Sequence, residues 1–242
     1  KLVDLREAQF LARVKVGDLG VSLDCTYPDA LDYATREVRS IGGNLLVITE
    51  HTRFKSKSRC HRIKGEIYKI ASLEGLEAQI HWHPARPLLA GDLRGKAAAG
   101  STFPPIQTTI SCRIGGDYFK EAILRTETIF WTDSTFRSGN AEQQAFLLRR
   151  AQLCFDIAEL HSRRLKADLL QLGADVSAIT GKYREMSIRQ QELLRQELEE
   201  LDSSLGNWSA TALSTAESRV QAELLRTPEL GLDIVVDLRK KK

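Results

Sequence analysis

The sequence predicts an α+β fold: a small β-α-β-β domain, then a larger domain of antiparallel strands and three helices. Strand-type segments, either alternating or continuously apolar, dominate the chain as far as residue 131. One helical segment interrupts them early, and helical spacing takes over after residue 140. We therefore expect a small α/β domain over residues 1–70, a linker over residues 71–78, and an α+β domain with a helical C-terminal part over residues 79–242.

The small domain is expected to begin with a strand over residues 9–16, which a Gly-Asp-Leu-Gly turn signal follows. Pro28 suits the first helical position, where no backbone N–H is needed. The glycine pair at 42–43 then ends the helix. A continuous apolar run over 44–49 predicts a buried strand, and the alternation over 62–70 predicts a half-solvated one.

The larger domain is expected to start with strands near 80–83, 106–114 and 119–131. The pair Gly115-Gly116 is a hairpin turn signal between the last two. Strands joined by a hairpin are antiparallel, so we expect this segment to form an antiparallel sheet. The sequence shows no internal repeat and no glycine-rich phosphate loop.

Helices are expected to follow. Asn140 is a good N-cap, and Gln143 stands three residues later, as in a capping box. The second of three helices is highly polar, which predicts that it projects or pairs and is not fully buried. The predicted helices and a last strand cover 140–173, 175–205, 210–225 and 231–237.

Composition narrows the function classes. The chain is 42% hydrophobic and 28% charged, which suits a globular protein with a core. No run of about 20 apolar residues occurs, so no membrane span is expected. The net charge is only +3 with both signs interspersed, which argues against a nucleic-acid surface. The basic tail at 239–242 is interpreted as a solvated end, and the start at Lys1 instead of Met indicates a processed or trimmed form.

The cysteines and histidines leave alternatives open. Four cysteines are compatible with one or two bridges in an oxidising compartment, or with free thiols in the cytosol. His81 and His83 share one face of a strand, but no third ligand stands near them in the sequence, so we expect structural histidines. His51, Cys60 and His61 suggest a metal site, and the competing interpretation places Cys60 in a disulfide.

The most informative stretch covers residues 146–160, F-L-L-R-R-A-Q-L-C-F-D-I-A-E-L. It resembles the active helix of a secreted zinc-dependent protease-like family of bacteria, common in Bacteroidetes, whose run is similar to L-L-x-H-E-Q-x-H-F-D-I-A-E-L. In an H-E-x-x-H helix, two histidines at i and i+4 share one face and hold the zinc ion. The glutamate beside the first histidine polarises the bound water.

This chain departs from the family at each of these zinc-site positions. Arg150 stands where the first histidine belongs, Ala151 where the glutamate belongs, and Cys154 where the second histidine belongs. Arg150 is a cation that repels a metal ion, although Cys154 is a legitimate ligand type. The resemblance therefore implies a degenerate site with no catalytic residue, no metal and no cofactor.

The resemblance extends over about residues 20–210. Residues 80–88 are similar to a W-x-P-x-R-x-L opening and residues 90–95 to a W-x-D-F-x-G element. Residues 23–27, 43–51 and 58–68 look like the small domain that precedes the protease-like domain in some members. A downstream Y-D-x-x-T-x-H-G-like element is matched at 201–207 only by Asp202 and its general spacing.

These departures predict a zincin-like but catalytically inactive protease homologue, a binding or structural subunit of a bacterial cell-envelope assembly with other proteins as partners. The resemblance implies a periplasmic or exported location, with any membrane attachment through a segment preceding Lys1. Export in turn favours a disulfide between Cys25 and Cys60. Cys112 and Cys154 are expected to be separate buried thiols.

Two other interpretations stay open. The first is an active hydrolase whose metal site is rebuilt from Cys154, Asp156 and His161, because His161 lies seven residues after Cys154 and returns to roughly the same helix face. The second is a cytosolic helical adaptor with no protease ancestry. Free thiols throughout the chain would favour that adaptor.

Overall fold

The structure is a computed structural model of the 242-residue chain. The residues it describes are 5–17, 27–52, 61–72, 77–95, 106–117, 121–135, 139–171, 176–206, 208–227 and 233–237. Cys25 and Cys60 lie outside these ranges, so the disulfide between them stays a prediction. The basic tail and Asn207 also lie outside them.

The first sheet combines three strands with one helix. β1 (Gln9–Val16), α1 (Tyr27–Ser40), β2 (Leu45–Thr52) and β3 (Arg62–Lys69) follow in the predicted β-α-β-β order. β3 lies in the middle, with β1 and β2 antiparallel on its two sides. The core of this unit consists of Val14, Val16, Ala30, Ala34, Val38, Ile63 and Ile67.

α1 ends at the predicted glycine pair. Gly42 has φ of 76°, a left-handed conformation that glycine adopts without strain. The N–H of Gly43 donates to the carbonyl oxygen of Val38 at 2.8 Å. A Cβ atom at Gly43 would lie 2.6 Å from Cγ2 of Ile67. Glycine therefore lets the chain turn closely against β3.

The second sheet is built around β6 (Glu121–Trp131). β5 (Thr108–Asp117) pairs along one edge of β6. β4 (Gln79–His81) and β7 (Asp233–Asp237) pair at the two ends of its other edge, and all three pairings are antiparallel. β6 is therefore the strand to which every other strand of this sheet is hydrogen bonded.

The expected turn at Gly115-Gly116 is wrong. Both glycines belong to β5, where they pair with Ile123 and Ala122 of β6. β5 therefore continues to Asp117, which pairs with Glu121, the first residue of β6. Glycine weakens a strand but does not interrupt its ladder, because its N–H and C=O groups are those of any other residue.

Three helices cover the second sheet. α2 (Ala141–Gln171), α3 (Val176–Leu205) and α4 (Ala210–Arg226) lie close to the predicted bounds. The N–H of Asn140 donates to Oε1 of Gln143, and the N–H of Gln143 donates to Oδ1 of Asn140, both at 2.9 Å. The predicted capping box at the start of α2 is thus confirmed.

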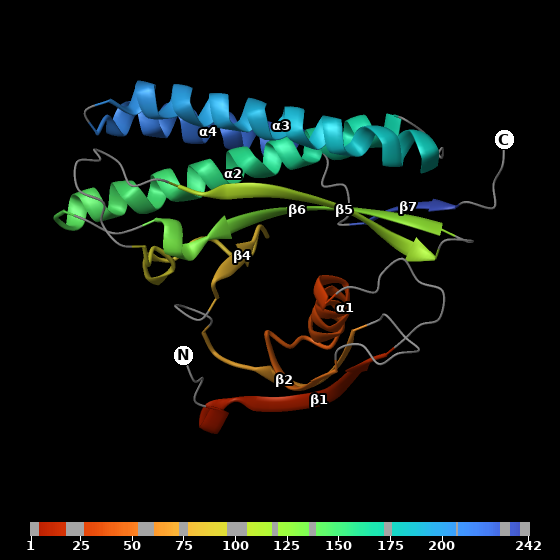
Figure 1. Ribbon diagram of the computed structural model, residues 1–242. Coiled ribbons are helices and arrows are strands. Elements are labelled where there is room, and N and C mark those ends of the chain that lie inside the picture. Colours follow the sequence, from red (N-terminus) through yellow and green to blue (C-terminus); the bar gives the residue numbers. More distant parts are fainter. Residues whose placement is uncertain are drawn as a thin grey trace.

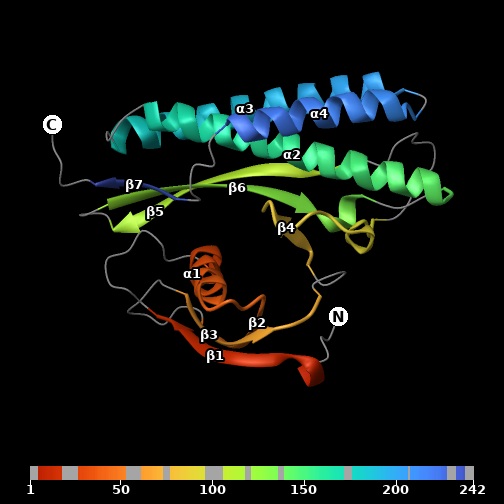
Figure 2. The ribbon, with the colours of Figure 1, turned by 180° about the vertical axis from the view of Figure 1, so that it is seen from behind.

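The elements are stacked in layers, and the predicted α+β class is confirmed. α1 lies between the two sheets, α2 lies on the other face of the second sheet, and α3 and α4 cover α2 (Figures 1 and 2). None of the helices within the described ranges combines the length and apolar character needed to span a bilayer. Short 3₁₀ helices occur at Leu5–Glu7, Ala90–Asp92 and Thr132–Ser134.

Candidate functional site

The stretch that carries the family resemblance lies in the middle of α2, enclosed on both sides. One side of α2 packs against β5 and β6, and the other packs against α3 and α4 (Figure 1). All side chains from Leu153 to Arg163 are buried, including five charged or titratable ones. The polar members of this run therefore need partners inside the protein.

Arg150 forms a buried ion pair with Asp202 of α3. Its Nη2 atom lies 2.6 and 2.7 Å from the two carboxylate oxygens, and its Nε atom lies 2.9 Å from Oδ1. The Arg150 side chain is 3% exposed, whereas the Asp202 side chain is 42% exposed. The planar guanidinium thus lies inside the protein with its charge balanced by a carboxylate near the surface.

Cys154 lies one helical turn after Arg150 and is also enclosed. Its side chain is 1% exposed, and burial raises the pKa of the thiol to about 12. The nearby Arg150 acts in the opposite direction but is the smaller influence. Because the thiolate is both the nucleophile and the metal ligand, the raised pKa of this thiol makes either role more costly.

Ala151 occupies a different environment. It is fully buried on the sheet side of α2, in a cluster with Leu88, Leu147 and Phe155. A glutamate here would place its carboxylate among apolar side chains. The position that resembles the catalytic glutamate is therefore part of the core.

The three positions matched to the zinc-site residues do not fit a zinc ion. They supply a cation, an alanine and a buried thiol whose pKa is raised, and the carboxylate of Asp202 already accepts hydrogen bonds from that cation. Zinc needs three or four ligands. Nowhere in the described part of the chain do three His, Cys, Asp or Glu side chains gather as metal ligands.

The alternative metal site at Cys154, Asp156 and His161 does not assemble either. Asp156 is hydrogen bonded to side chains from β4's C-terminal end and α4, and His161 to side chains of α3. Seven residues of helix also separate the backbones of Cys154 and His161 by about 10 Å. Asp156 and His161 therefore have different partners, and neither is directed at Cys154.

Asp156 is the acceptor at the centre of a buried hydrogen-bond network. Its Oδ1 atom accepts from Trp82 Nε1 at 2.8 Å and from Gln152 Nε2 at 2.9 Å, and its Oδ2 atom accepts from Gln221 Nε2 at 2.9 Å. Burial raises the pKa of Asp156, and the three hydrogen bonds partly oppose this shift. Hydrogen bonds from neutral side chains thus replace those that an exposed carboxylate accepts from water.

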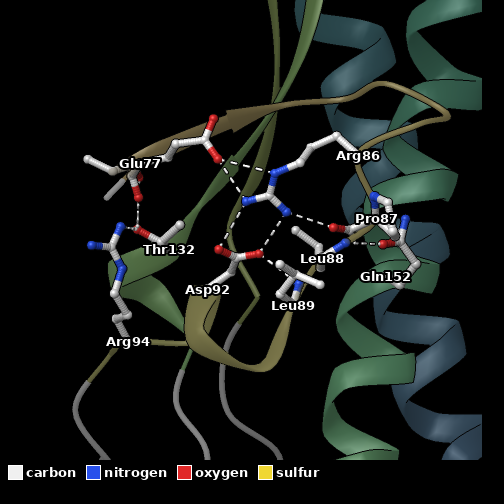
Figure 3. Close-up of polar contacts among 10 residues, drawn as sticks. Glu77, Arg86, Pro87, Leu88, Leu89, Asp92, Arg94, Thr132 and Gln152 are labelled. Atoms are coloured by element: carbon white, nitrogen blue, oxygen red, sulfur yellow. Dashed lines mark hydrogen bonds and ion pairs between the residues drawn. The ribbon is translucent and has the colours of Figure 1, made fainter. Parts of the chain in front are cut away.

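Gln152 also fixes the segment after β4 on α2, and Figure 3 shows this contact together with those of Arg86. Oε1 of Gln152 accepts from the N–H of Leu88 at 2.7 Å. Arg86 donates to both carboxylate oxygens of Asp92 at 3.0 and 3.1 Å, to Glu77 at 2.7 Å, and to the carbonyl oxygen of Pro87 at 2.7 Å. These contacts hold the loop in one conformation against the helix.

A second network ties α2 to the sheet and to the end of α4. Glu159 accepts from Thr128 Oγ1 at 2.8 Å and from Arg163 Nε at 2.9 Å. Arg163 also donates to the carbonyl oxygens of Leu224 and Thr227, which end α4, and its guanidinium lies 5.1 Å from the Trp82 ring centroid. The i, i+4 spacing of Glu159 and Arg163 was a sequence signal for this pair.

A groove of about 1130 Å³ runs between α3 and α4, with His161 of α2 among its lining residues. Nε2 of His161 lies 2.9 Å from Oε2 of Glu197, and Nδ1 accepts from Gln190 at 2.6 Å. The hydrogen bond from His161 lowers the pKa of Glu197, which also accepts from Arg219. Because both ring nitrogens of His161 are engaged, the imidazole is held as a structural group.

Of the other four histidines, His81 and His83 contact separate partners, whereas His51 and His61 form a pair. Nδ1 of His81 lies 3.7 Å from Glu127, and Nδ1 of His83 accepts from the N–H of Ala85 at 3.1 Å. These two therefore have different partners, as expected for structural histidines. His51 and His61 do meet, with ring nitrogens 2.8 Å apart.

The two cysteines that the structure describes are not bridged. Cys112 is partly buried and Cys154 is buried, and both are free thiols. Burial raises the pKa of Cys112 to about 11. This agrees with the expectation of separate thiols, while Cys25 and Cys60 lie outside the described ranges.

Comparison with protein-family models, with curated proteins and with solved structures finds no match for this chain. The resemblance to the zinc-dependent protease-like family therefore rests on the sequence motifs alone. The geometry above is the independent information about the site.

Proposed function

We propose that this protein is a catalytically inactive homologue of a zinc protease that acts as a binding or structural subunit of a cell-envelope assembly. The observation that carries the proposal is the ion pair between Arg150 and Asp202. At the position that resembles the first zinc ligand, the chain supplies the positive charge itself. The guanidinium takes the place of a metal cation opposite a carboxylate, and Asp202 belongs to the stretch matched to the family's downstream element.

The other residues of the resemblance support a structural reading. Trp82 and Arg86 belong to the opening motif, and Gln152 and Asp156 belong to the helix motif. They are hydrogen bonded within one network that fixes the segment after β4 on α2. The fold needs these residues to hold the segment after β4 on α2, whether or not a zinc ion and proteolytic activity are present. This explains how the fold can be kept after the zinc site is lost.

Zinc content is the direct test of the inactive site. The purified protein, dialysed against trace zinc, is expected to retain no stoichiometric zinc in elemental analysis and to leave casein uncleaved. Cys154→Ala is the matched variant, because it removes the last ligand type on this helix face. One zinc per chain that disappears in Cys154→Ala would overturn the proposal.

The assembly role has its own test. The protein is isolated by affinity from its native cells with membranes intact, solubilised in mild detergent, and sized under native conditions. It is expected in the exported fraction and in a species well above the 27.1 kDa of the chain. Recovery only as a cytosolic monomer would contradict both the location and the role.

A further inference from the structure

His51 and His61 form a pair of facing imidazoles at one end of the first sheet. His51 belongs to β2, and His61 immediately precedes β3, which pairs antiparallel with β2 from Thr52 and Arg62 onward. Nε2 of His51 lies 2.8 Å from Nδ1 of His61, and the two rings are stacked with 15° between their planes. The pairing of the two strands therefore brings together residues that are ten apart in the sequence.

A third ring holds the pair in place. Tyr27, the first residue of α1, has its ring centroid 4.5 Å from that of His51 and 5.9 Å from that of His61. Three elements thus converge on the two imidazoles. Packing of this kind fixes ring orientation before a ligand arrives, while the exposed hydrogen bond between the rings leaves the pair open to solvent.

The spacing of the two nitrogens decides which ligand fits. An imidazole nitrogen binds a first-row metal at about 2.0–2.1 Å, so two such ligands lie about 2.9 Å apart at a right angle and about 3.3 Å apart in a tetrahedron. The observed 2.8 Å is the length of a hydrogen bond between the two nitrogens, and it is closer to the right-angle value than to the tetrahedral one. Right angles between nitrogen ligands are typical of square-planar or tetragonal Ni²⁺ and Cu²⁺.

We propose that His51 Nε2 and His61 Nδ1 are two adjacent ligands of a Ni²⁺- or Cu²⁺-type ion. Without metal, one of the facing nitrogens carries a proton and the other accepts it. On binding, that imidazole moves its proton to its far nitrogen, which frees the lone pairs of both facing nitrogens for the ion. The exchange releases no net proton from two neutral imidazoles.

The test is a calorimetric titration of the reduced full-length chain with Ni²⁺ near neutral pH. Ni²⁺ is the probe because, unlike Cu²⁺, it does not oxidise the free thiols. One ion per chain is expected, and His51→Gln and His61→Gln should each weaken binding by about tenfold or more. His83→Gln is the matched control and should bind as the unchanged protein does, because His83 belongs to the second part of the chain.

Two results would overturn the proposal. The first is equal Ni²⁺ affinity in the unchanged chain and in the double variant His51→Gln with His61→Gln. The second is loss of binding in Cys60→Ser with retention in His51→Gln, which would assign the ion to thiols. If the variants do not fold, nuclear magnetic resonance of the unchanged chain during the Ni²⁺ titration decides: loss or shift of the His51 and His61 imidazole signals supports the site, and unchanged signals refute it.

This inference does not depend on the proposed function. The His51–His61 pair lies on the first sheet, whereas the degenerate zinc site lies between α2 and α3. Substitutions at one place leave the side chains of the other unchanged. Failure of the nickel titration would therefore leave the zinc and assembly tests of the proposed function intact.

Discussion

The indole N–H of Trp82 donates to the carboxylate of Asp156 at 2.8 Å, across 74 residues of sequence. Gln152 and Gln221 supply the other two donors to the same carboxylate. A buried anion is thus held by three neutral side chains from three segments. Its protonation is therefore linked to the stability of the contact between α2, α4 and the segment after β4.

Asp156→Asn is expected to change how stability depends on pH. Burial raises the pKa of Asp156 above its ordinary 3.8, so the folded state holds the proton more tightly than the unfolded chain. For such a group, stability falls as pH rises through the interval between the two values. The stability of the unchanged protein relative to Asp156→Asn should therefore increase as pH is lowered from 7 to about 4. Urea unfolding over a pH series measures this, and a constant difference would contradict it.

Asp202→Ala is expected to leave Arg150 as a buried cation without its partner. The cost should be about 1–3 kcal/mol, less than for a fully buried pair because Asp202 is partly exposed. Adding Arg150→Met should recover part of this loss, since the charge is removed together with its counter-charge. A double-mutant cycle by urea unfolding tests the coupling, and additive effects within about 0.5 kcal/mol would show that the pair is not coupled.

Arg86→Ala is expected to destabilise the protein by about 2–4 kcal/mol, because the carboxylate of Asp92 is 1% exposed and would lose its counter-charge. Arg13→Ala is the matched control. It removes an arginine that is 81% exposed and pairs with Glu66 at 3.4 Å, so its effect should stay within about 0.5 kcal/mol. Thermal unfolding compares the two. Equal effects would mean that the Arg86 network has no special role in the fold.

Restoring the zinc residue types is expected to produce no protease. Helix propensity alone predicts that Arg150→His, Ala151→Glu and Cys154→His together cost only a few tenths of a kcal/mol. Packing predicts a larger loss, because Ala151 is fully buried and a glutamate there overpacks the core and buries a carboxylate. The triple variant should therefore unfold more easily than the double variant that keeps Ala151. Chelator-sensitive cleavage of casein by the triple variant would refute this expectation.

The elements of the fold could be predicted because their signals are local. The strand at 9–16 coincides with β1, and the Asn140–Gln143 pair caps α2 as expected. Period, caps and glycine stops act within a few residues, so a single sequence records them. The glycine pair at 115–116 misled because a turn residue can also occupy a strand.

The site could be predicted only in part. The sequence placed Arg150 and Cys154 on one helix face and matched Asp202 to the downstream element of the family that the chain resembles. It could not show that Arg150 and Asp202 meet, or that Trp82 reaches Asp156, because each contact joins segments more than 50 residues apart. Nor could it show that Ala151 is in the core, because burial depends on what packs against the helix.

Because α2 is enclosed, its burial determines which substitutions at this site can be accepted during evolution. No partner can touch Arg150 or Cys154 without opening the protein, so selection for binding acts on other surfaces. Each residue of the buried pair is instead constrained by the other, because loss of either charge leaves the other buried without a counter-charge. Across related sequences, Arg150 and Asp202 should therefore be exchanged together, as cation with carboxylate or as two uncharged residues, and seldom one at a time.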